Sequence, residues 1–424
     1  GNPPYVQIQK MNFDFSLIKT KYETFEQTGD IYILFYEKGL EILSKTGLLN
    51  FITSNKWMRA NYGESFRKFL CEKTKCIQLI DFNFYQVFDE ASVDTNILFL
   101  SSGITDEINS ATLIKESFKL EEINLYVENN KVKITNLSKN YWNIVSQEKS
   151  QLNEKLKKKG IELASWGLSF NYGIKTGLND AFIIDEATKK KLNEKDPKNE
   201  NVIVPYLRGR DIRRFGIKHE ELWLINTHNG VKSDGIEPIN VNQDYPKILD
   251  FFNEFQPKIS NRSDKGDHWS NLRNCAYLND FTKEKLVYAE TMRVHKGDTS
   301  NFPRFGYDNQ GFYCDKTTFI VTGKNIKFLL GILNSKVGNY LVREYVTKLD
   351  TGGYMMQKVF LEKIPVIEPP IGEEVTNNVE KILALKKSDP TADTSSLEAE
   401  IDLLVYRLYG LTEEEIGIVE GSGG

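Results

Sequence analysis

The sequence predicts an α/β protein that begins with a doubly wound sheet, continues with a mixed α+β domain rich in strands and loops, and ends in helices. Three observations indicate this order. Helical and strand patterns alternate over the first 100 residues, Gly, Asn and Asp turns separate aromatic and β-branched runs after Trp166, and helical spacing of apolar residues returns after Val375. We expect the domains to be residues 1–148, a helical linker at 149–165, residues 166–370, and C-terminal helices with a flexible tail at 371–424.

In the first domain, apolar residues at helical spacing predict a helix over residues 30–44, followed by a short apolar run at 48–52 that suits a buried strand. A second helix is expected at 62–73, and further strands are expected at 76–82 and 95–100, the last after an Asp/Glu/Ser turn at 89–92. Strand–helix–strand repetition of this kind is typical of part of a doubly wound sheet.

The rest of the chain changes in character. A charged helical stretch at 149–163 reads as the connector, with its lysines on a solvated face. Residues 166–365 alternate between strands and polar turns, and two helices are expected at 375–385 and 396–409 across a turn at 388–395.

Composition excludes several classes of protein. The 424 residues are 40% hydrophobic and 27% charged, as in ordinary soluble chains. The four cysteines lack C-x-x-C spacing and the four histidines are scattered, which argues against a disulfide scaffold, a zinc ribbon or another metal site. Since no apolar run approaches the ~18 residues of a membrane span, we expect a cytoplasmic monomer with no membrane association.

The net charge of −4 hides an uneven distribution. Residues 155–360 carry a net charge of +8, whereas residues 1–154 carry −3 and residues 361–424 carry −9. A basic middle between acidic flanks indicates a surface that binds anions. Chance variation among solvated charges is the alternative explanation.

The motif that suggests chemistry is Asn2-Pro3-Pro4-Tyr5. The two prolines fix the backbone and remove two amide donors, so carbonyls are left open. The Asn2 amide oxygen and the Pro3 carbonyl are two acceptors for a planar amino group, and Tyr5 offers a ring that can stack. Hydrogen bonds from both amino hydrogens favour sp³ geometry at the nitrogen and make its lone pair a nucleophile for methyl transfer. The alternative is a proline-stiffened turn.

Asn-Pro-Pro-Tyr resembles the catalytic motif of amino-group methyltransferases that use S-adenosylmethionine. Residues 30–35, 47–60 and 88–95 are similar to the segments that follow it in γ-class DNA adenine methyltransferases. The resemblance implies the C-terminal part of a Rossmann-like methyltransferase sheet, S-adenosylmethionine as cofactor, and double-stranded DNA as partner. It also implies that Phe88 stacks on the second face of a flipped adenine.

Two related families differ from this pattern. Protein-glutamine methyltransferases share Asn-Pro-Pro-Tyr but end soon after the catalytic half-domain, and cytosine-amino enzymes usually carry Ser at the first position. Asn2 therefore favours adenine as the target.

Downstream, residues 172–179, 205–212, 332–335 and 400–410 are similar to the TaqI-like specificity domain of modification methyltransferases and Type IIG restriction–modification enzymes. The resemblance implies that residues 166–370 recognise the DNA sequence.

Cations in two Gly-containing segments are the candidates for DNA contact: Lys175, Arg208, Arg210, Arg213 and Arg214. The alternative for the arginines is a solvated loop in which one of them pairs with Asp211. Weaker candidates are Arg262, Lys265, Arg293, Lys296 and Lys348.

A Gly-rich turn for the cofactor is missing, since no G-x-G occurs before Gly421-Ser422-Gly423. In the γ arrangement this turn precedes the catalytic motif. We therefore expect this sequence to be a fragment that begins just before Asn2, lacks most of the cofactor site and is inactive alone. Two other functions remain open: a DNA-specificity module without catalysis, and a protein or RNA amino-group methyltransferase.

Overall fold

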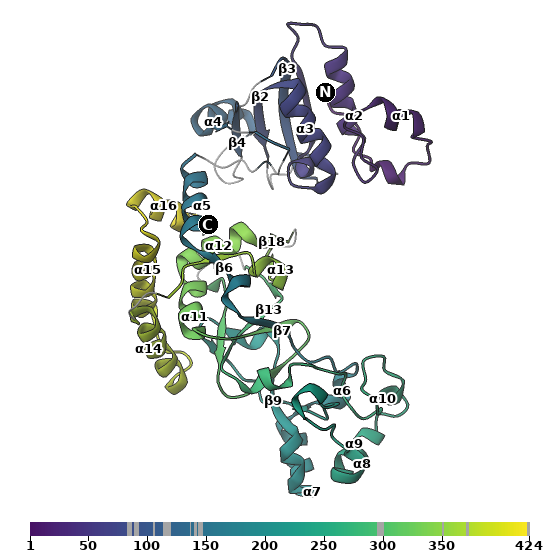
Figure 1. Ribbon diagram of the computed structural model, residues 1–424, viewed down its shortest axis with the longest axis vertical. Coiled ribbons are helices and arrows are strands. Elements are labelled where there is room, and N and C mark those ends of the chain that lie inside the picture. Colours follow the sequence, from purple (N-terminus) through teal and green to yellow (C-terminus); the bar gives the residue numbers. More distant parts are fainter. Residues whose placement is uncertain are drawn as a thin grey trace. The chain divides into compact units, whose positions relative to one another are not determined.

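The computed structural model describes residues 1–82, 87–88, 93–104, 107–112, 120–135, 137–139, 142, 147–294, 301–349, 352–369 and 373–421. The chain separates into two compact units, Gly1–Leu152 and Asn153–Gly424 (Figure 1). The turn expected at 89–92 and the end of the tail, 422–424, lie outside the described residues. In the described part of the chain, no helix is long and apolar enough to cross a membrane.

The first unit is built on a five-stranded sheet in the order β1-β3-β2-β4-β5. Strand β3 runs antiparallel to both of its neighbours, β4 is parallel to β2, and β5 is antiparallel to β4. Strands β1 and β2 therefore point the same way, joined by a helical crossover, and β3 is inserted between them. The strands are β1 (Leu49–Ser54), β2 (Thr74–Asp81), β3 (Thr95–Ser102), β4 (Glu107–Thr112) and β5 (Val132–Thr135).

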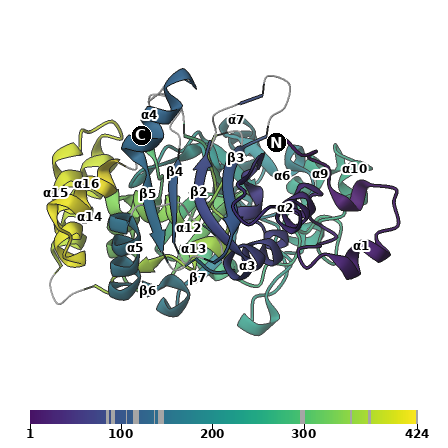
Figure 2. The ribbon, with the colours of Figure 1, turned by 90° about the horizontal axis from the view of Figure 1, so that it is seen from above.

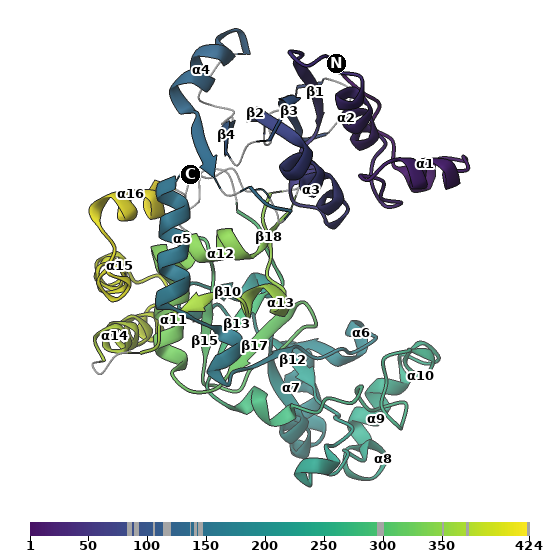
Figure 3. The ribbon, with the colours of Figure 1, turned by 45° about the horizontal axis from the view of Figure 1, so that its top comes forward.

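Helices α2 (Tyr32–Glu41) and α3 (Glu64–Lys73) pack on the β1–β2 part of this sheet, and α4 (Ile123–Asn130) lies by β4 (Figure 3). Tyr32 on α2, Phe66 on α3 and Trp57 in the turn after β1 form the core with Leu79 and Leu98. The elements expected at 30–44, 48–52, 62–73, 76–82 and 95–100 are present within a few residues. The short helix α1 (Ser16–Lys21), α4, β4 and β5 were not predicted.

The second unit contains two four-stranded sheets, in the orders β16-β9-β12-β8 and β15-β13-β17-β7, and several shorter pairs. Their common core includes Phe182, Leu224, Phe252, Phe281 and Cys314. The strands are β6 (Ile161–Glu162), β7 (Ser169–Tyr172), β8 (Ile183–Asp185), β9 (Ile203–Leu207), β10 (Ile212–Arg213), β11 (Gly216–Ile217), β12 (Leu222–Ile225), β13 (Lys285–Ala289), β14 (Thr291–Met292), β15 (Gly306–Asp308), β16 (Tyr313–Cys314), β17 (Thr318–Thr322), β18 (Thr347–Lys348), β19 (Tyr354–Met355) and β20 (Pro365–Val366).

Helices surround these sheets. The expected connector is α5 (Gln147–Lys159), and a helical group sits beside β8 and β9 (Figure 1). That group comprises α6 (Asn179–Phe182), α7 (Glu186–Lys195), α8 (Val241–Asp244), α9 (Pro246–Asn253) and α10 (Lys258–Asn261). The remaining helices of the middle domain are α11 (Ile326–Asn334), α12 (Lys336–Tyr345) and α13 (Lys358–Leu361).

The two C-terminal helices that the sequence predicted are α14 (Glu374–Ser388) and α15 (Ser395–Tyr409), and a third, α16 (Glu413–Gly421), was missed. The three helices lie side by side (Figure 2), and they contact α11 and α12. The overall class, an α/β sheet followed by a mixed α+β domain and C-terminal helices, is confirmed.

Candidate functional site

The Asn-Pro-Pro-Tyr segment, which we call the acceptor loop (residues 2–5), starts beside strand β1. The Gly1 nitrogen donates to the Asn50 carbonyl at 2.8 Å, and the Ile52 amide donates to the Gly1 carbonyl at 2.9 Å. This is the bonding pattern of two parallel strands, so the acceptor loop leaves at the carboxyl end of β1. Ligands bind at this edge in open α/β sheets.

The first two positions of the acceptor loop present open acceptors. Asn2 is exposed and Pro3 is buried. Among the residues that the structure describes, none donates a hydrogen bond to the Asn2 side chain or to the Pro3 carbonyl. The loop can therefore accept two hydrogen bonds from one planar amino group.

The ring of Tyr5 is held from two sides. Its hydroxyl donates to the Ile52 carbonyl at 2.9 Å, and its ring meets the edge of Tyr32 at a centroid distance of 6.0 Å. Burial raises the pKa of Tyr5 to about 12, so the phenol stays neutral and keeps this bond near neutral pH.

Phe88, which the sequence assigned to the second face of a base, lies near Tyr5. The two ring centroids are 6.4 Å apart and their planes meet at 64°. A base between two rings needs a spacing of about 7 Å, twice the ~3.5 Å contact distance of carbon atoms. The spacing is close to this value, and one ring must turn for the planes to become parallel.

The loop that follows β1 carries polar residues that the sequence prediction did not single out. Asn55 is buried and donates to Asp81 at 2.9 Å, and Arg59 lies 3.8 Å from the same carboxylate. Lys56 and Arg59 are exposed. Their position directly after the strand that adjoins the acceptor loop was the signal available in the sequence.

The buried side chain of Arg67 stabilises the conformation of this loop. It is only 1% exposed and donates to the carbonyls of Trp57, Ala60 and Lys139. Glycine is required at position 63, since an added Cβ would lie 2.0 Å from the Trp57 carbonyl oxygen. The sequence gave no sign that this arginine is internal.

In the second unit, the two segments with candidate cations start at one sheet edge. Ile174 forms a bridge with Asp315, and the Asp315 amide donates to the Leu207 carbonyl at 3.1 Å. Lys175 follows Ile174, and Arg208 follows Leu207. The fold thus brings together segments that are more than 30 residues apart in sequence.

Lys175 is half-buried, and its Nζ lies 5.7 Å from the ring centroid of Tyr172, an exposed aromatic residue at the end of β7. The turn after Lys175 is fixed by Arg262, which is 6% exposed and stacks on Phe182 at 4.3 Å. Burial lowers the pKa of Arg262 to about 10. The Arg262 guanidinium donates to the carbonyls of Ile259, Thr176, Asp264, Trp269 and Asn271.

Arg262 was a weaker candidate for DNA contact, and that prediction was wrong, because the side chain is an internal crosslink between loops. Lys296 lies outside the described residues.

We call residues 208–214 the arginine segment. Two of its four arginines pair with carboxylates of the protein itself. Arg208 binds both oxygens of buried Asp211 at 3.1 and 3.2 Å and also pairs with Glu220 at 3.1 Å. These partners raise the pKa of Arg208. Arg210 is exposed and forms no ion pair with a described residue.

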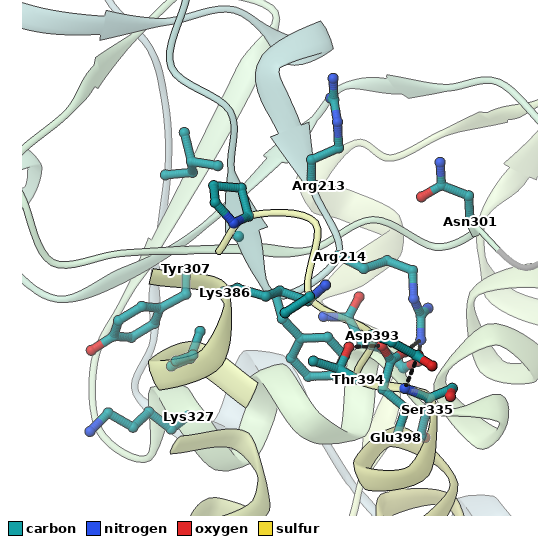
Figure 4. Close-up of a pocket in the computed structure, with 18 of the residues that line it drawn as sticks. Arg213, Arg214, Asn301, Tyr307, Lys327, Ser335, Lys386, Asp393, Thr394 and Glu398 are labelled. Carbon is teal, nitrogen blue, oxygen red and sulfur yellow. Dashed lines mark hydrogen bonds and ion pairs between the residues drawn. The ribbon is translucent and has the colours of Figure 1, made fainter. Parts of the chain in front are cut away.

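The end of the segment is a two-residue hairpin between β10 and β11. Phe215 is 1% exposed and has a φ of 60°, a strained conformation for a bulky residue, so burial of its ring holds the turn. Arg213 is exposed, and its Nη1 donates to the carbonyls of Arg210 and Ile212 at 2.6 and 3.0 Å. Arg214 turns inward, where it donates to Glu398 and to the Asn334 carbonyl, each at 2.7 Å (Figure 4).

Arg214 forms part of the floor of a groove of about 1920 Å³ between this hairpin and the α14–α15 turn (Figure 4). Arg214 forms an ion pair with Glu398. Two lysines that line the groove are paired as well, Lys327 with Glu380 and Lys336 with Glu420. No cluster of three metal-ligating side chains occurs in the part of the chain that the structure describes.

Comparison with known proteins finds one matching family in each of the two units. Residues 1–88 match the Eco57I restriction-modification methylase family, and residues 204–366 match the TaqI-like C-terminal specificity domain. The Type II methyltransferase M.BstVI of Geobacillus stearothermophilus is 24% identical, over 99% of this chain and 74% of its own length. M.PaeR7I of Pseudomonas aeruginosa is 22% identical, over 100% and 72%.

Among solved structures, the Type IIL restriction-modification enzyme MmeI in complex with DNA has a similar fold, with a TM-score of 0.53 and 15% identity. The match covers 98% of this chain and 55% of the MmeI chain, so this chain spans little more than half of that enzyme. The chain therefore combines a region that matches an Eco57I-type methylase with one that matches a TaqI-like C-terminal specificity domain, and the curated relatives that it matches over nearly its whole length are Type II methyltransferases.

Proposed function

We propose that this chain binds an adenine flipped out of double-stranded DNA and presents its exocyclic amino group to the methyl group of S-adenosylmethionine. The observation that carries the proposal is the pair of open acceptors, the Asn2 amide oxygen and the Pro3 carbonyl, next to the rings of Tyr5 and Phe88. We place this reaction in the cytoplasm, in a monomeric protein with no membrane contact.

The two acceptors explain how an unreactive amino group becomes a nucleophile. The amino nitrogen of adenine is conjugated to its ring, so its lone pair is not free to attack. Hydrogen bonds from both amino hydrogens to Asn2 and Pro3 pull the nitrogen towards sp³ geometry and direct the lone pair away from the two acceptors. The preformed loop supplies this arrangement without reorganisation, because its prolines already fix the backbone.

Tyr5 and Phe88 hold the base from its two faces in this proposal. Stacking on aromatic rings replaces the stacking that the base loses when it leaves the duplex. The Tyr5 hydroxyl is bound to the Ile52 carbonyl, so this ring is the fixed one, and Phe88 is the ring that turns to become parallel with the base.

The described residues fit the acceptor base and not the methyl donor itself. Neither the acceptor loop nor the edge of β1 supplies a Gly-rich turn that opens a helix, the usual cradle for such a cofactor. S-adenosylmethionine brings an activated methyl group, and the residues of this chain position the nitrogen that receives it.

Sequence recognition is assigned to residues 166–370, with Lys175, Arg210 and Arg213 as the direct DNA contacts. These side chains are on the sheet edge around Asp315 or on the hairpin that follows it. Arg208 and Arg214 have carboxylate partners, so their role is to fix the geometry from which Arg210 and Arg213 project.

The test is to express the native full-length protein in a host without adenine methylation and to map modified bases by single-molecule sequencing. We expect 6-methyladenine at one short sequence motif, and its loss with Asn2→Ala. Finding 4-methylcytosine, or equal methylation by the variant, contradicts the proposal. Sequence-specific DNA binding without any methylation supports a specificity module instead.

A further inference from the structure

Twenty residues that follow the acceptor loop form a long loop whose two ends lie next to each other. Gln7 pairs with Asp30 in an antiparallel bridge, and the Ile8 amide donates to the Gly29 carbonyl at 2.9 Å. These contacts form a neck two residues beyond Tyr5. We call residues 9–28, which contain α1, the finger; α1 lies beyond α2 on the side away from the sheet (Figures 1 and 3).

The finger is held by contacts of its own. Phe13 packs on Phe15 with ring centroids 5.0 Å apart, and Phe15 packs on Phe25 at 5.9 Å. On the return arm, the amide and the hydroxyl of Thr24 both donate to Glu37 on α2, at 2.9 and 2.7 Å. The finger therefore presents a defined surface.

That surface has exposed apolar side chains among cations. Phe13 is 60% exposed and Leu17 is 81% exposed, although Phe and Leu are usually buried. Three lysines on the same stretch are exposed: Lys10, Lys19 and Lys21. Asp14 is the one acidic residue of the outgoing arm and α1, residues 9–22, and the return arm carries Glu23, which pairs with Lys73, and Glu26.

Position and charge identify the partner. A chain spans at most about 3.5 Å per residue, so the neck lies within roughly 7 Å of the Tyr5 Cα. This is less than the ~12 Å width of a major groove. A duplex that delivers a base to Tyr5 therefore passes over the base of the finger. Lysines match its phosphates, and exposed apolar side chains are what DNA-distorting proteins insert between base steps.

We propose that the finger is a second DNA-contacting element, distinct from the specificity domain. Phe13 and Leu17 press against the duplex next to the extruded adenine, and Lys10, Lys19 and Lys21 bind the flanking phosphates. This inference rests on the proposed function, since it assumes that a base is delivered to Tyr5.

The apolar tip is tested with the full-length protein and a duplex that carries the mapped sequence, with 2-aminopurine in place of the target adenine for the flipping assay. The double variant Phe13→Ser/Leu17→Ser is expected to reduce kcat/KM for methylation about tenfold, the size of effect expected from losing one or two apolar contacts. It is also expected to reduce the 2-aminopurine fluorescence that reports flipping. The matched control, Ile42→Ser/Leu125→Ser, removes two side chains of the same unit that are 72% and 64% exposed, and should behave as wild type.

The cations are tested by salt dependence. Lys10→Glu/Lys19→Glu/Lys21→Glu should reduce the slope of log affinity against log salt by about 3, because each lost phosphate contact contributes about 0.9. The control Lys45→Glu/Lys68→Glu/Lys75→Glu reverses three other exposed lysines of the unit and should leave this slope closer to wild type.

Wild-type kcat/KM and an unchanged salt slope in both sets of finger variants overturn the proposal. So does a wild-type dimer that Phe13→Ser/Leu17→Ser converts to a monomer without a change in DNA binding, since the tip would then cover a second copy. If the wild-type protein does not methylate DNA, the proposed function fails, whereas the salt slope still decides whether the finger binds DNA.

Discussion

The acceptor loop and the arginine segment are both short and both rich in functional side chains, but they use their polar groups in opposite ways. In the acceptor loop, no residue in the described part of the chain donates to the Asn2 amide oxygen or the Pro3 carbonyl, so both can accept from a ligand. In the arginine segment, Arg208 and Arg214 bind carboxylates of the protein itself. The difference teaches that a charge counted in the sequence is not yet a charge available to DNA.

The largest effect is expected from a substitution in the acceptor loop. Asn2→Ala removes one of the two acceptors and should reduce the methylation rate by about 10²–10³-fold, the range for loss of one preorganised hydrogen-bonding group. DNA affinity should stay at the wild-type value, since the change lies outside the basic domain. Single-turnover methylation and fluorescence anisotropy measure the two quantities.

Asn50→Ala is the matched control, because Asn50 is exposed on the neighbouring strand and takes part through its backbone carbonyl only. If both variants lose activity equally, Asn2 has no special role and the contrast between the two segments disappears.

The internal use of charge in the second unit is tested at Lys285 and Asp308, a pair 2.5 Å apart with both side chains fully buried. Lys285→Ala leaves a buried carboxylate without its cation and should lower the free energy of unfolding by roughly 3–5 kcal/mol. Urea unfolding measures this change. Lys247→Ala breaks an exposed pair with Asp250 and should cost less than about 1 kcal/mol.

A double replacement, Lys285→Met/Asp308→Leu, should recover most of the lost stability, because it removes both charges together. Failure of this rescue would indicate that the hydrogen bonds of Asp308 to the amides of Gln310 and Phe312 matter more than the ion pair.

Within the arginine segment, the expected effect on DNA binding and on stability depends on which arginine is replaced. Arg210→Ala/Arg213→Ala should reduce the salt slope of DNA binding by about 2 and weaken binding about tenfold, with unchanged stability. Arg208→Ala should leave the salt slope unchanged and lower the free energy of unfolding by about 1–3 kcal/mol, since Asp211 is 1% exposed and loses its partner. The reverse assignment would mean that Arg208 leaves Asp211 to bind DNA.

The smallest effect concerns Asp402 on α15, whose pKa burial raises to about 6. Between pH ~4 and ~6 the folded protein retains a proton that the unfolded chain releases, so the free energy of unfolding falls as the pH rises through this window. Asp402→Asn keeps an acceptor for the Lys336 amide without this penalty. It should raise the free energy of unfolding by about 1 kcal/mol at pH 8 and leave it unchanged near pH 4.

Asp393→Asn provides the opposite sign. Hydrogen bonds from Ser395 lower the pKa of Asp393. The charged carboxylate therefore stabilises the fold at pH values above the ordinary pKa of an aspartate. The variant should lose stability at pH 8 and approach wild type only below pH 3.8, as the pH falls through the lowered pKa of the folded protein. Thermal unfolding across this pH range measures both variants, and shifts of the same sign would contradict the assignment.

Sequence patterns predicted the elements whose apolar spacing is local and strong, such as α2, β1, α3 and α15. They missed β4, which is largely polar, and α16, which begins with three glutamates and contains a glycine. The acceptor loop was predictable because prolines fix a backbone within four residues. The partners of Arg214 and Arg262 were not, because Glu398 lies 184 residues from Arg214 and Thr176 lies 86 residues from Arg262.

The neck between Gln7 and Asp30 separates the finger from the acceptor loop. Because its ends already meet, residues between them can be lengthened, shortened or exchanged at a small entropic cost, and the chemistry two residues away stays intact. The finger is in this sense a replaceable cassette. Under the role proposed for the finger, changes in residues 9–28 should alter how firmly the protein holds DNA and should leave the acceptor loop unchanged.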